Sequence, residues 1–385
     1  MKPAATLSLI LLATMAVPAL GQDTHLETAR RVLAETPLID GHNDLPWAIR
    51  NSEIAPHDVE AASHDLRMAT AFHTDLQRLR AGMVGGQFWS VYIPYEAVEE
   101  GAAKVQLEQI DIALQVIAKY PETLELARTA SDLEGAFGRG RVASMLGMEG
   151  GHAIENSLGS LRAFYAMGVR YMTLTHNGTL PWADACCDEA RHGGLTEFGK
   201  EVVREMNRLG MLVDISHTSP ETMNDALDVA EAPVIWSHAS ARAVHEHARN
   251  VPDQVLRRLP DNGGVVMITF VPSFLTGRAE ATIADVADHI DHVANLAGVD
   301  HVGIGSDFDG IDSTPVGLED VSTFPALFAE LSRRGWSEDD LAKLAGENVL
   351  RVWREAEAVA RRLQRERPPS TKTIAELDGT VGDDR

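Results

Sequence analysis

The sequence predicts a single (β/α)8 TIM-like barrel, in which eight parallel strands alternate with helices and close into a cylinder. Short apolar runs rich in β-branched residues alternate with longer segments of helical periodicity. Histidines and carboxylates follow several of these runs, at the strand ends where barrel enzymes place their active sites. A chain of 385 residues, 44% hydrophobic and 24% charged, is long enough for one large domain of this kind.

Eight segments have the continuous apolar pattern of buried parallel strands. They are Pro37–Asp40, Gln87–Ile93, Arg141–Met148, Arg170–Leu174, Met211–Ile215, Pro233–Trp236, Gly264–Thr269 and His301–Ile304. Amphipathic stretches between most of them predict helices. Five examples are Lys104–Lys119, Leu158–Met167, Glu197–Leu209, Pro220–Val229 and Ile283–Leu296. A doubly wound open sheet is the alternative fold, but Gly82, Gly85 and Gly86 lack the spacing of its phosphate-binding loop.

The N-terminus has the pattern of a secretory signal peptide. Lys2 precedes an apolar stretch from Leu7 to Val17, and small residues lead to a cleavage position after Gly21. This stretch is shorter than the roughly 20 residues that span a bilayer. We predict a signal peptide at residues 1–21, the barrel domain at 22–366 and a polar tail at 367–385. The protein is expected to be exported to the periplasm or the medium, with no membrane segment after cleavage.

Composition excludes some partners and one kind of stabilisation. Acidic residues outnumber basic ones by 57 to 34, and the resulting net charge of −23 would repel nucleic acid and anionic membranes. Cys186 and Cys187 are the only cysteines and are adjacent, so no disulfide can close a long loop within the chain. We interpret them as loop thiols, because no motif for a metal or redox role accompanies them.

Residue types that bind metals follow the first and third predicted strands. The first strand leads into His42 and Asp44, whose side chains point the same way in an extended chain. This pair suits a divalent metal, although a surface histidine beside a helix-capping aspartate has the same pattern. The third strand leads into Glu149, set between Met148 and two glycines. A carboxylate buried there needs a cation, either a metal or a nearby arginine.

The next three predicted strands each lead to a histidine. These are His176, His217 and His238. Each alone is more typical of a structural histidine than of a ligand. Asp307 follows the eighth strand and adds a further carboxylate. Together with His42, Asp44 and Glu149, these residues exceed the three protein ligands of one catalytic zinc. They fit two metals about 3.5–4 Å apart with a bridging hydroxide, which predicts metal-assisted hydrolysis.

Seven motifs occur in order along the chain. They are Asp40–Trp47, Gly147–His152, Leu174–Asn177, Pro181–Asp184, Ala232–His238, Arg249–Asp253 and Gly305–Gly310. In this order they resemble the membrane (renal) dipeptidase family of zinc metallopeptidases. The resemblance extends from about Thr36 to Trp353 and covers nearly the whole mature chain. It implies a (β/α)8 barrel, a binuclear zinc site and the hydrolysis of dipeptides.

The resemblance also implies how the metal site is built. His42 and Asp44 would hold one Zn²⁺ ion. His217 and His238 would hold a second, and Glu149 would bridge the two. A hydroxide between the ions would attack the peptide carbonyl. The implied cofactor is therefore two Zn²⁺ ions, and the implied partner is a dipeptide, a small molecule.

Three other residues are implied to act on the substrate. His176 would contact the substrate carbonyl and stabilise the oxyanion, and Asp307 would protonate the leaving amine. Arg249 would bind the terminal carboxylate in a bidentate manner. His152 is interpreted as a structural residue near the site. The implied catalytic residues are thus Asp307, His176 and Glu149, with His176 and Arg249 binding substrate.

The chain departs from family members on animal cell surfaces, which carry a lipid anchor and disulfides. Its C-terminal segment is polar and lacks the hydrophobic signal of such an anchor, so it resembles a soluble exported bacterial relative. A homodimer, if formed, would rest on packing without an interchain disulfide. The sequence does not rank dipeptide substrates, a D-residue at the C-terminal position, or the opening of β-lactams.

Two other functions compete with a dipeptidase. Another binuclear barrel amidohydrolase would act on cyclic amides, lactones or phosphoesters, but it usually begins with H-x-H and often uses a carbamylated lysine as the bridge. Glu149 at the bridging position favours the dipeptidase. A periplasmic binding protein would have two lobes and no metal, which would leave the histidines at the strand ends unexplained.

Overall fold

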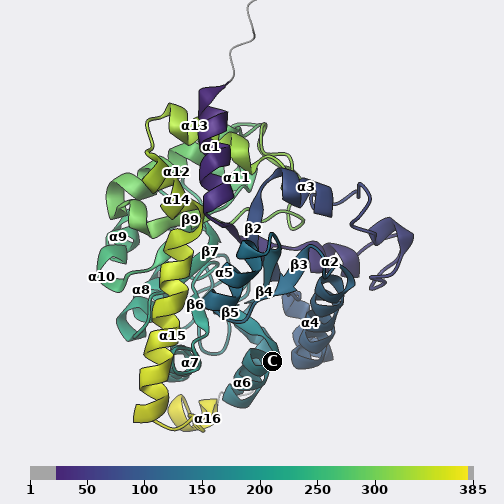
Figure 1. Ribbon diagram of the computed structural model, residues 1–385. Coiled ribbons are helices and arrows are strands. Elements are labelled where there is room, and N and C mark those ends of the chain that lie inside the picture. Colours follow the sequence, from purple (N-terminus) through teal and green to yellow (C-terminus); the bar gives the residue numbers. More distant parts are fainter. Residues whose placement is uncertain (1–22, 380–385) are drawn as a thin grey trace, which may run out of the picture.

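The computed structural model describes residues 23–379 and shows a parallel barrel surrounded by helices (Figure 1). The predicted signal peptide lies outside the described residues. Eight barrel strands each overlap a predicted strand. They are β1 (Leu38–Asn43), β2 (Val84–Ser90), β4 (Val142–Glu149), β5 (Val169–Thr173), β6 (Leu212–Asp214), β7 (Ile235–Ala239), β8 (Val265–Ile268) and β9 (Val302–Ile304). The strand order runs from β2 through β1 and β9 to β4, and pairing of β2 with β4 closes the barrel. The predicted (β/α)8 fold is confirmed.

A short additional strand, β3 (Leu124–Leu126), was not predicted. It pairs with the first half of β4, where Leu124 lies opposite Val142. The second half of β4 pairs with β5 instead, so β3 and β5 share one edge of β4. Three residues with one glutamate between two leucines carry too little periodicity for a strand to be recognised. The pairing with β4 alone makes this segment a strand.

Helices connect the strands and cover the outside of the barrel (Figure 1). They are α1 (Thr24–Glu35), α2 (Leu45–Arg50), α3 (Leu76–Ala81), α4 (Ala102–Lys119), α5 (Ala130–Gly138), α6 (Leu158–Met167), α7 (Glu197–Leu209), α8 (Pro220–Val229), α9 (Asp253–Leu256), α10 (Leu259–Asn262), α11 (Pro272–Leu275), α12 (Ile283–Ala297), α13 (Phe324–Arg333), α14 (Glu338–Ala342), α15 (Asn348–Glu366) and α16 (Ile374–Leu377). The five helices predicted by example correspond to α4, α6, α7, α8 and α12. Ser157, Thr196 and Ser219 begin α6, α7 and α8 by accepting a hydrogen bond from a backbone amide of the first turn.

Side chains fill the barrel interior and form a continuous stack below the strand ends. Trp353 of α15 packs against Phe88 of β2, and Phe88 packs against Tyr171 of β5. All three are buried. Gly147 of β4 makes room for this stack, since a Cβ there would lie 2.0 Å from the Tyr171 ring. Tyr171 in turn reaches the imidazole of His42 at the C-terminal ends of the strands. The packed interior thus supports the residues at the rim.

The described part of the predicted C-terminal tail packs against the barrel domain. Asp378, just after α16, accepts hydrogen bonds from the backbone amide of Phe198 at 3.1 Å and from the Thr196 hydroxyl at 2.7 Å. These contacts hold the segment at the start of α7, and α16 lies next to α7 (Figure 1). Among the described helices, none combines the length and the apolar character that crossing a bilayer requires.

Candidate metal centre

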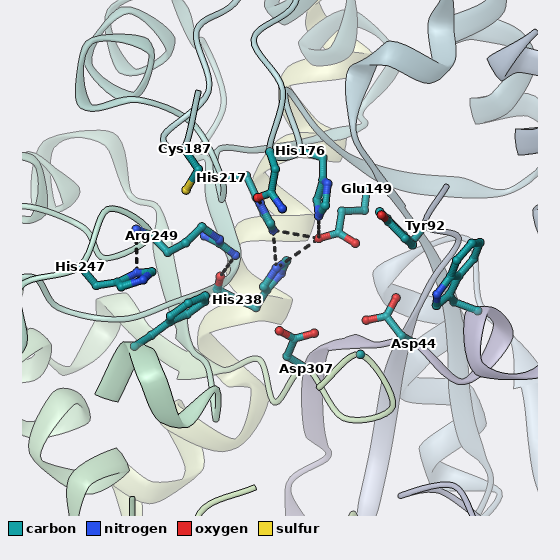
Figure 2. A pocket seen from close by; sticks show the side chains of 14 residues that line it. Asp44, Tyr92, Glu149, His176, Cys187, His217, His238, His247, Arg249 and Asp307 are labelled. Atoms are coloured by element: carbon teal, nitrogen blue, oxygen red, sulfur yellow. Dashed lines mark hydrogen bonds and ion pairs between the residues drawn. The ribbon is translucent and has the colours of Figure 1, made fainter. Parts of the chain in front are cut away.

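The five predicted metal ligands lie at or near the C-terminal ends of the barrel strands. His42 belongs to β1, and Asp44 follows that strand directly. Glu149 is the last residue of β4, and His238 lies in β7. His217 follows β6 in a short turn. All five are buried, so water contributes little to solvating their charges. Figure 2 shows four of them, all except His42, around one cavity.

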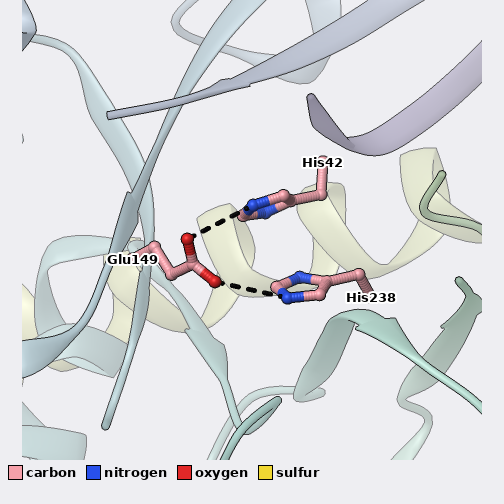
Figure 3. Close-up of side chains that lie close together, drawn as sticks. All are labelled: His42, Glu149 and His238. Atoms are coloured by element: carbon pink, nitrogen blue, oxygen red, sulfur yellow. Dashed lines mark ion pairs between the residues drawn. The ribbon is translucent and has the colours of Figure 1, made fainter. Parts of the chain in front are cut away.

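The carboxylate of Glu149 lies at the centre of this group and faces two sides. Its Oε2 atom lies 3.4 Å from Nε2 of His42, which also lies 3.1 Å from Oδ2 of Asp44. Its Oε1 atom lies 2.9 Å from Nε2 of His217 and 3.3 Å from Nε2 of His238. Figure 3 shows Glu149 beside His42 and His238, with one carboxylate oxygen directed at each ring. Each carboxylate oxygen therefore has its own set of partners.

The Nδ1 atom of His42 faces away from Glu149 and is held by Tyr171, a residue of the barrel interior. This Nδ1 atom lies 2.8 Å from the Tyr171 hydroxyl, which donates to the backbone carbonyl of Gly41 at 3.2 Å. Because the tyrosine hydrogen is used there, His42 Nδ1 is the donor of the first bond. In the neutral ring, this arrangement leaves Nε2 of His42 with a lone pair directed at Glu149.

His217 and His238 are held in the same way. Nδ1 of His217 lies 3.0 Å from Oδ1 of Asn177, an acceptor, so it carries the proton. Nδ1 of His238 lies 2.9 Å from Oγ of Ser237, whose hydrogen goes to Asp214 at 2.6 Å. Nδ1 is again the donor. Partners of this kind commonly orient histidines that bind metals through the other nitrogen.

The atoms that face the centre of this group have lone pairs, and among the described residues no N–H or O–H group donates a hydrogen bond to them. The Nε2 atoms of His217 and His238 lie only 2.9 Å apart, and both face Oε1 of Glu149. Nε2 of His42 and Oδ1 of Asp44 are buried and have no hydrogen-bond partner within residues 23–379. Imidazole nitrogens with carboxylate oxygens are a donor set that suits divalent zinc. The residues therefore fit a metal centre.

The electrostatics of the centre agree with this donor set. Burial lowers the pKa of His217 and of His238 well below the ordinary value, which keeps both imidazoles neutral and able to bind metal. Burial would raise the pKa of Glu149, but the histidines beside it lower it well below its usual value. Burial also opposes a charge on His42, yet Tyr171 and the two carboxylates raise its pKa well above the ordinary value. The carboxylates thus favour a positive charge here, which a bound metal ion would supply in place of a proton on His42.

Asp307 approaches the same centre from the loop after β9. Its backbone is left-handed, with φ of 68°, and its amide donates to the carbonyl of His42 at 3.0 Å. One ligand atom each from Asp307, His42 and Asp44 lies within 4.8 Å of the others. Burial and the charges of Asp44 and Glu149 raise the pKa of Asp307 well above its usual value, although His42 opposes the shift. A Cβ at Gly310 would collide with the carboxylates of both aspartates, so the loop closes tightly over them.

His176 and Arg249 extend the centre into a cavity. Nε2 of His176 lies 3.9 Å from Oε1 of Glu149, beyond hydrogen-bond distance. Arg249 is 3% exposed, and its Nη2 donates to the carbonyl of His238 at 3.2 Å. Its Nη1 is buried and has no hydrogen-bond partner in the part of the chain that the structure describes. A buried guanidinium with a free donor suits an anionic group of a ligand.

The cavity has a volume of about 620 Å³, a size that accommodates a small ligand. It is lined by Asp44, Trp47, Tyr92, Glu149, His176, Asn177, Cys187, His217, His238, His247, Arg249, Phe274, Asp307 and Gly310. Figure 2 shows Arg249 and His247 on one side of the metal-ligand group and Tyr92 on the other. The carboxylates and histidines lie between these two sides.

Residues 26–367 match the model of the membrane dipeptidase family, peptidase family M19. The chain belongs to this family. It resembles the crystal structure of dipeptidase AC, a metallo peptidase of family M19, with 29% identity over 83% of this chain and 98% of that one and a TM-score of 0.75. It also resembles a metallo peptidase from Rhodobacter sphaeroides liganded with a phosphinate mimic of the dipeptide L-Ala-D-Ala. That match has 27% identity, covers 83% of this chain and 99% of that one, and has a TM-score of 0.74.

The probable dipeptidase PvdM from Pseudomonas aeruginosa shares the fold, with 22% identity over 88% of this chain and all of that one (100%) and a TM-score of 0.79. Family membership and the similar metallo-dipeptidase structures identify this protein as a metallo-dipeptidase, a hydrolase with small-molecule substrates. The residues that the sequence predicted for the site all meet in and beneath one cavity of this metallo-dipeptidase.

The sequence analysis gave no site role to several cavity residues, among them Tyr92, Trp47, His247 and Phe274. Tyr92 lies two residues beyond the end of β2 at Ser90, and the predicted strand ran past it to Ile93. With the end of the strand placed at Ser90, the rule that selected the histidines after other strands would also have selected Tyr92. Trp47 lies in a recognised motif but received no role. His247 and Phe274 come from the loops after β7 and β8, where one sequence does not show which residues fold inward.

Two further predictions concern residues beside the site. Nε2 of His152 lies 3.1 Å from the backbone carbonyl of Ile93, and His152 does not line the cavity. Both cysteines are free thiols. Cys187, interpreted from the sequence as a loop thiol, lines the cavity, and the Cys186 side chain lowers its pKa to about 7. The amide of Cys186 donates to the carbonyl of His217 at 2.7 Å, which ties this loop to the metal-ligand segment.

Proposed function

We propose that this metallo-dipeptidase uses two Zn²⁺ ions. His42 and Asp44 would hold one ion, beside Oε2 of Glu149. His217 and His238 would hold the other, beside Oε1 of Glu149. The observation that carries this proposal is the division of partners between the two oxygens of one buried carboxylate. Two such ions supply an activated water and polarise the scissile carbonyl.

The chain's own residues would bind the dipeptide and move its proton. The free Nη1 of Arg249 would bind the terminal carboxylate, which places the peptide bond over the centre. His176, at the edge of the ligand group, would donate a hydrogen bond to the carbonyl oxygen as charge develops on it. Asp307 would carry the proton to the leaving amine. Because Arg249 fixes the carboxylate rather than the side chain, we also propose that a C-terminal D-residue is accepted.

Hydrolysis of dipeptides with L- or D-residues at the C-terminal position tests this function. The zinc-loaded protein is expected to cleave them, and a chelator is expected to lower the rate to background. Added Zn²⁺ is expected to restore it, with about two ions bound per chain by elemental analysis. A rate unaffected by chelation would contradict metal-dependent hydrolysis, and one bound ion at full activity would contradict the binuclear site.

Arg249→Ala is expected to weaken dipeptide binding selectively. Removing the charge-assisted interaction between the guanidinium and the carboxylate should raise KM by roughly 100-fold, with a smaller change in kcat. The measurement compares KM for a dipeptide with KM for its C-terminal amide, which has no carboxylate for the guanidinium to bind. An equal rise for both substrates would show that Arg249 supports the structure rather than the carboxylate.

A further inference from the structure

One wall of the cavity contains the imidazole of His247 and the guanidinium of Arg249. Neither the sequence motifs nor the proposed mechanism assigns a role to the imidazole. His247 lies two residues before Arg249, and both side chains line the cavity (Figure 2). The ring of His247 stacks on Phe274, with centroids 4.3 Å apart and planes inclined by 28°. The guanidinium of Arg249 lies over the same phenyl ring, 5.4 Å from its centroid. Phe274 therefore supports both side chains.

The hydrogen bonds of His247 determine where its proton lies. The backbone amide of Arg249 donates to Nδ1 of His247 at 3.2 Å, so Nδ1 is an acceptor. In the neutral ring the proton is then on Nε2. Burial and the nearby charge of Arg249 lower the pKa of His247, which favours this neutral form. His247 thus carries an N–H donor on a side chain that lines the same cavity as Arg249, whose Nη1 has no partner among the described residues.

The loop that carries these two residues is held in place by four hydrogen bonds. The side-chain amide of Asn250 donates to the carbonyl of Phe274 at 2.7 Å and to that of His245 at 2.9 Å. Arg242 donates to the carbonyls of Asn250 and Ala248 at 3.0 Å and 2.9 Å. The bond from Asn250 to Phe274 joins the loop to α11, and the other three bonds brace the loop internally. Donors on a fixed loop bind a ligand with little loss of conformational entropy.

We propose that Nε2–H of His247 is a second hydrogen-bond donor to the terminal carboxylate of the substrate, beside Nη1 of Arg249. A carboxylate has two oxygens and accepts several donors, so one oxygen can bind the guanidinium and the other the imidazole. His247 is then a specificity-determining residue that selects dipeptides with a free carboxylate. This inference rests on the proposed function of Arg249 at the same site.

Two substitutions separate this role from structural support. His247→Asn keeps an acceptor near the position of Nδ1 for the Arg249 amide but removes the donor at Nε2. His247→Gln keeps a donor near the position of Nε2 but loses that acceptor. The measured quantity is the ratio of kcat/KM for a dipeptide to kcat/KM for its C-terminal amide. We expect the ratio to fall about tenfold or more in the Asn variant and to stay within about threefold of wild type in the Gln variant.

An Asn variant with the wild-type ratio, or a Gln variant that falls as far as the Asn variant, would overturn the proposal. A binding measurement keeps this test independent of turnover. Free alanine is expected to raise the midpoint of thermal unfolding of the zinc-loaded wild-type protein more than alaninamide does, and His247→Asn is expected to reduce that difference. Absence of dipeptide turnover in the wild type would count against the proposed function, whereas an unchanged difference in the Asn variant would count against His247 alone.

Discussion

Glu149→Gln is expected to lower bound metal from two ions to one or none and to reduce kcat/KM by about 1,000-fold or more. Both oxygens of Glu149 face histidine Nε2 atoms, Oε2 toward His42 and Oε1 toward His217 and His238. An amide replaces one oxygen by an N–H group and removes the negative charge. The neutral imidazoles would then have no shared anion to hold two cations near each other. Elemental analysis and dipeptide turnover measure the two effects.

Glu205→Gln is a matched control for the burial and charge of Glu149. Glu205 lies in α7 and pairs with Arg208 at 2.8 Å and with Arg162 at 3.1 Å, and it does not line the cavity. Its substitution is expected to lower the midpoint of thermal unfolding while both metals and turnover per folded molecule are retained. Retention of both metals and full rate in Glu149→Gln would remove Glu149 from the bridging role.

Asp307→Asn is expected to lower kcat by roughly 100- to 10,000-fold while the metal content stays near the wild-type level. The asparagine side chain has the same shape and tolerates the left-handed backbone at this position, where φ is 68°. It cannot carry a proton to the leaving amine. The centre would keep its three histidines and two other carboxylates, so metal binding would persist. Steady-state kinetics together with metal analysis separate the two effects.

Asp309→Asn tests whether disturbance of the loop explains such a loss. Asp309 is also left-handed, with φ of 64°, but its carboxylate accepts a hydrogen bond from the His73 amide and does not line the cavity. Its substitution is expected to leave kcat within about tenfold of wild type. If Asp307→Asn lost both metals, Asp307 would be a ligand rather than the proton carrier.

Most strands and several helices of the barrel could be predicted from local sequence patterns. The interior strands are continuous apolar runs because both of their faces are buried, and this pattern marked all eight. Amphipathic periodicity marked α4, α6, α7, α8 and α12 in the same way. The strand β3 was missed because its three residues become a strand only through pairing with β4. Tyr92 was missed because the end of β2 was placed too late in the sequence.

The candidate ligands could be recognised from sequence because every barrel strand delivers its C-terminal residues to one rim. His42, Glu149 and His238 were predicted as a group for this reason, and the structure brings them together. The sequence thus determined the fold, the family and the residue types at the centre. Each of these depends on the order of residues along one strand or on a motif within one loop.

The tertiary structure alone decided how these residues are held and what surrounds them. Tyr171 reaches His42, Asn177 reaches His217, and Asp214 reaches His238 through Ser237, each from a different strand or loop. The position of His247 on Phe274 beside Arg249 likewise joins two loops. Such contacts depend on barrel closure and on how loops pack over the rim. Local propensity and periodicity carry no information on either, because the contacting residues are far apart in the sequence.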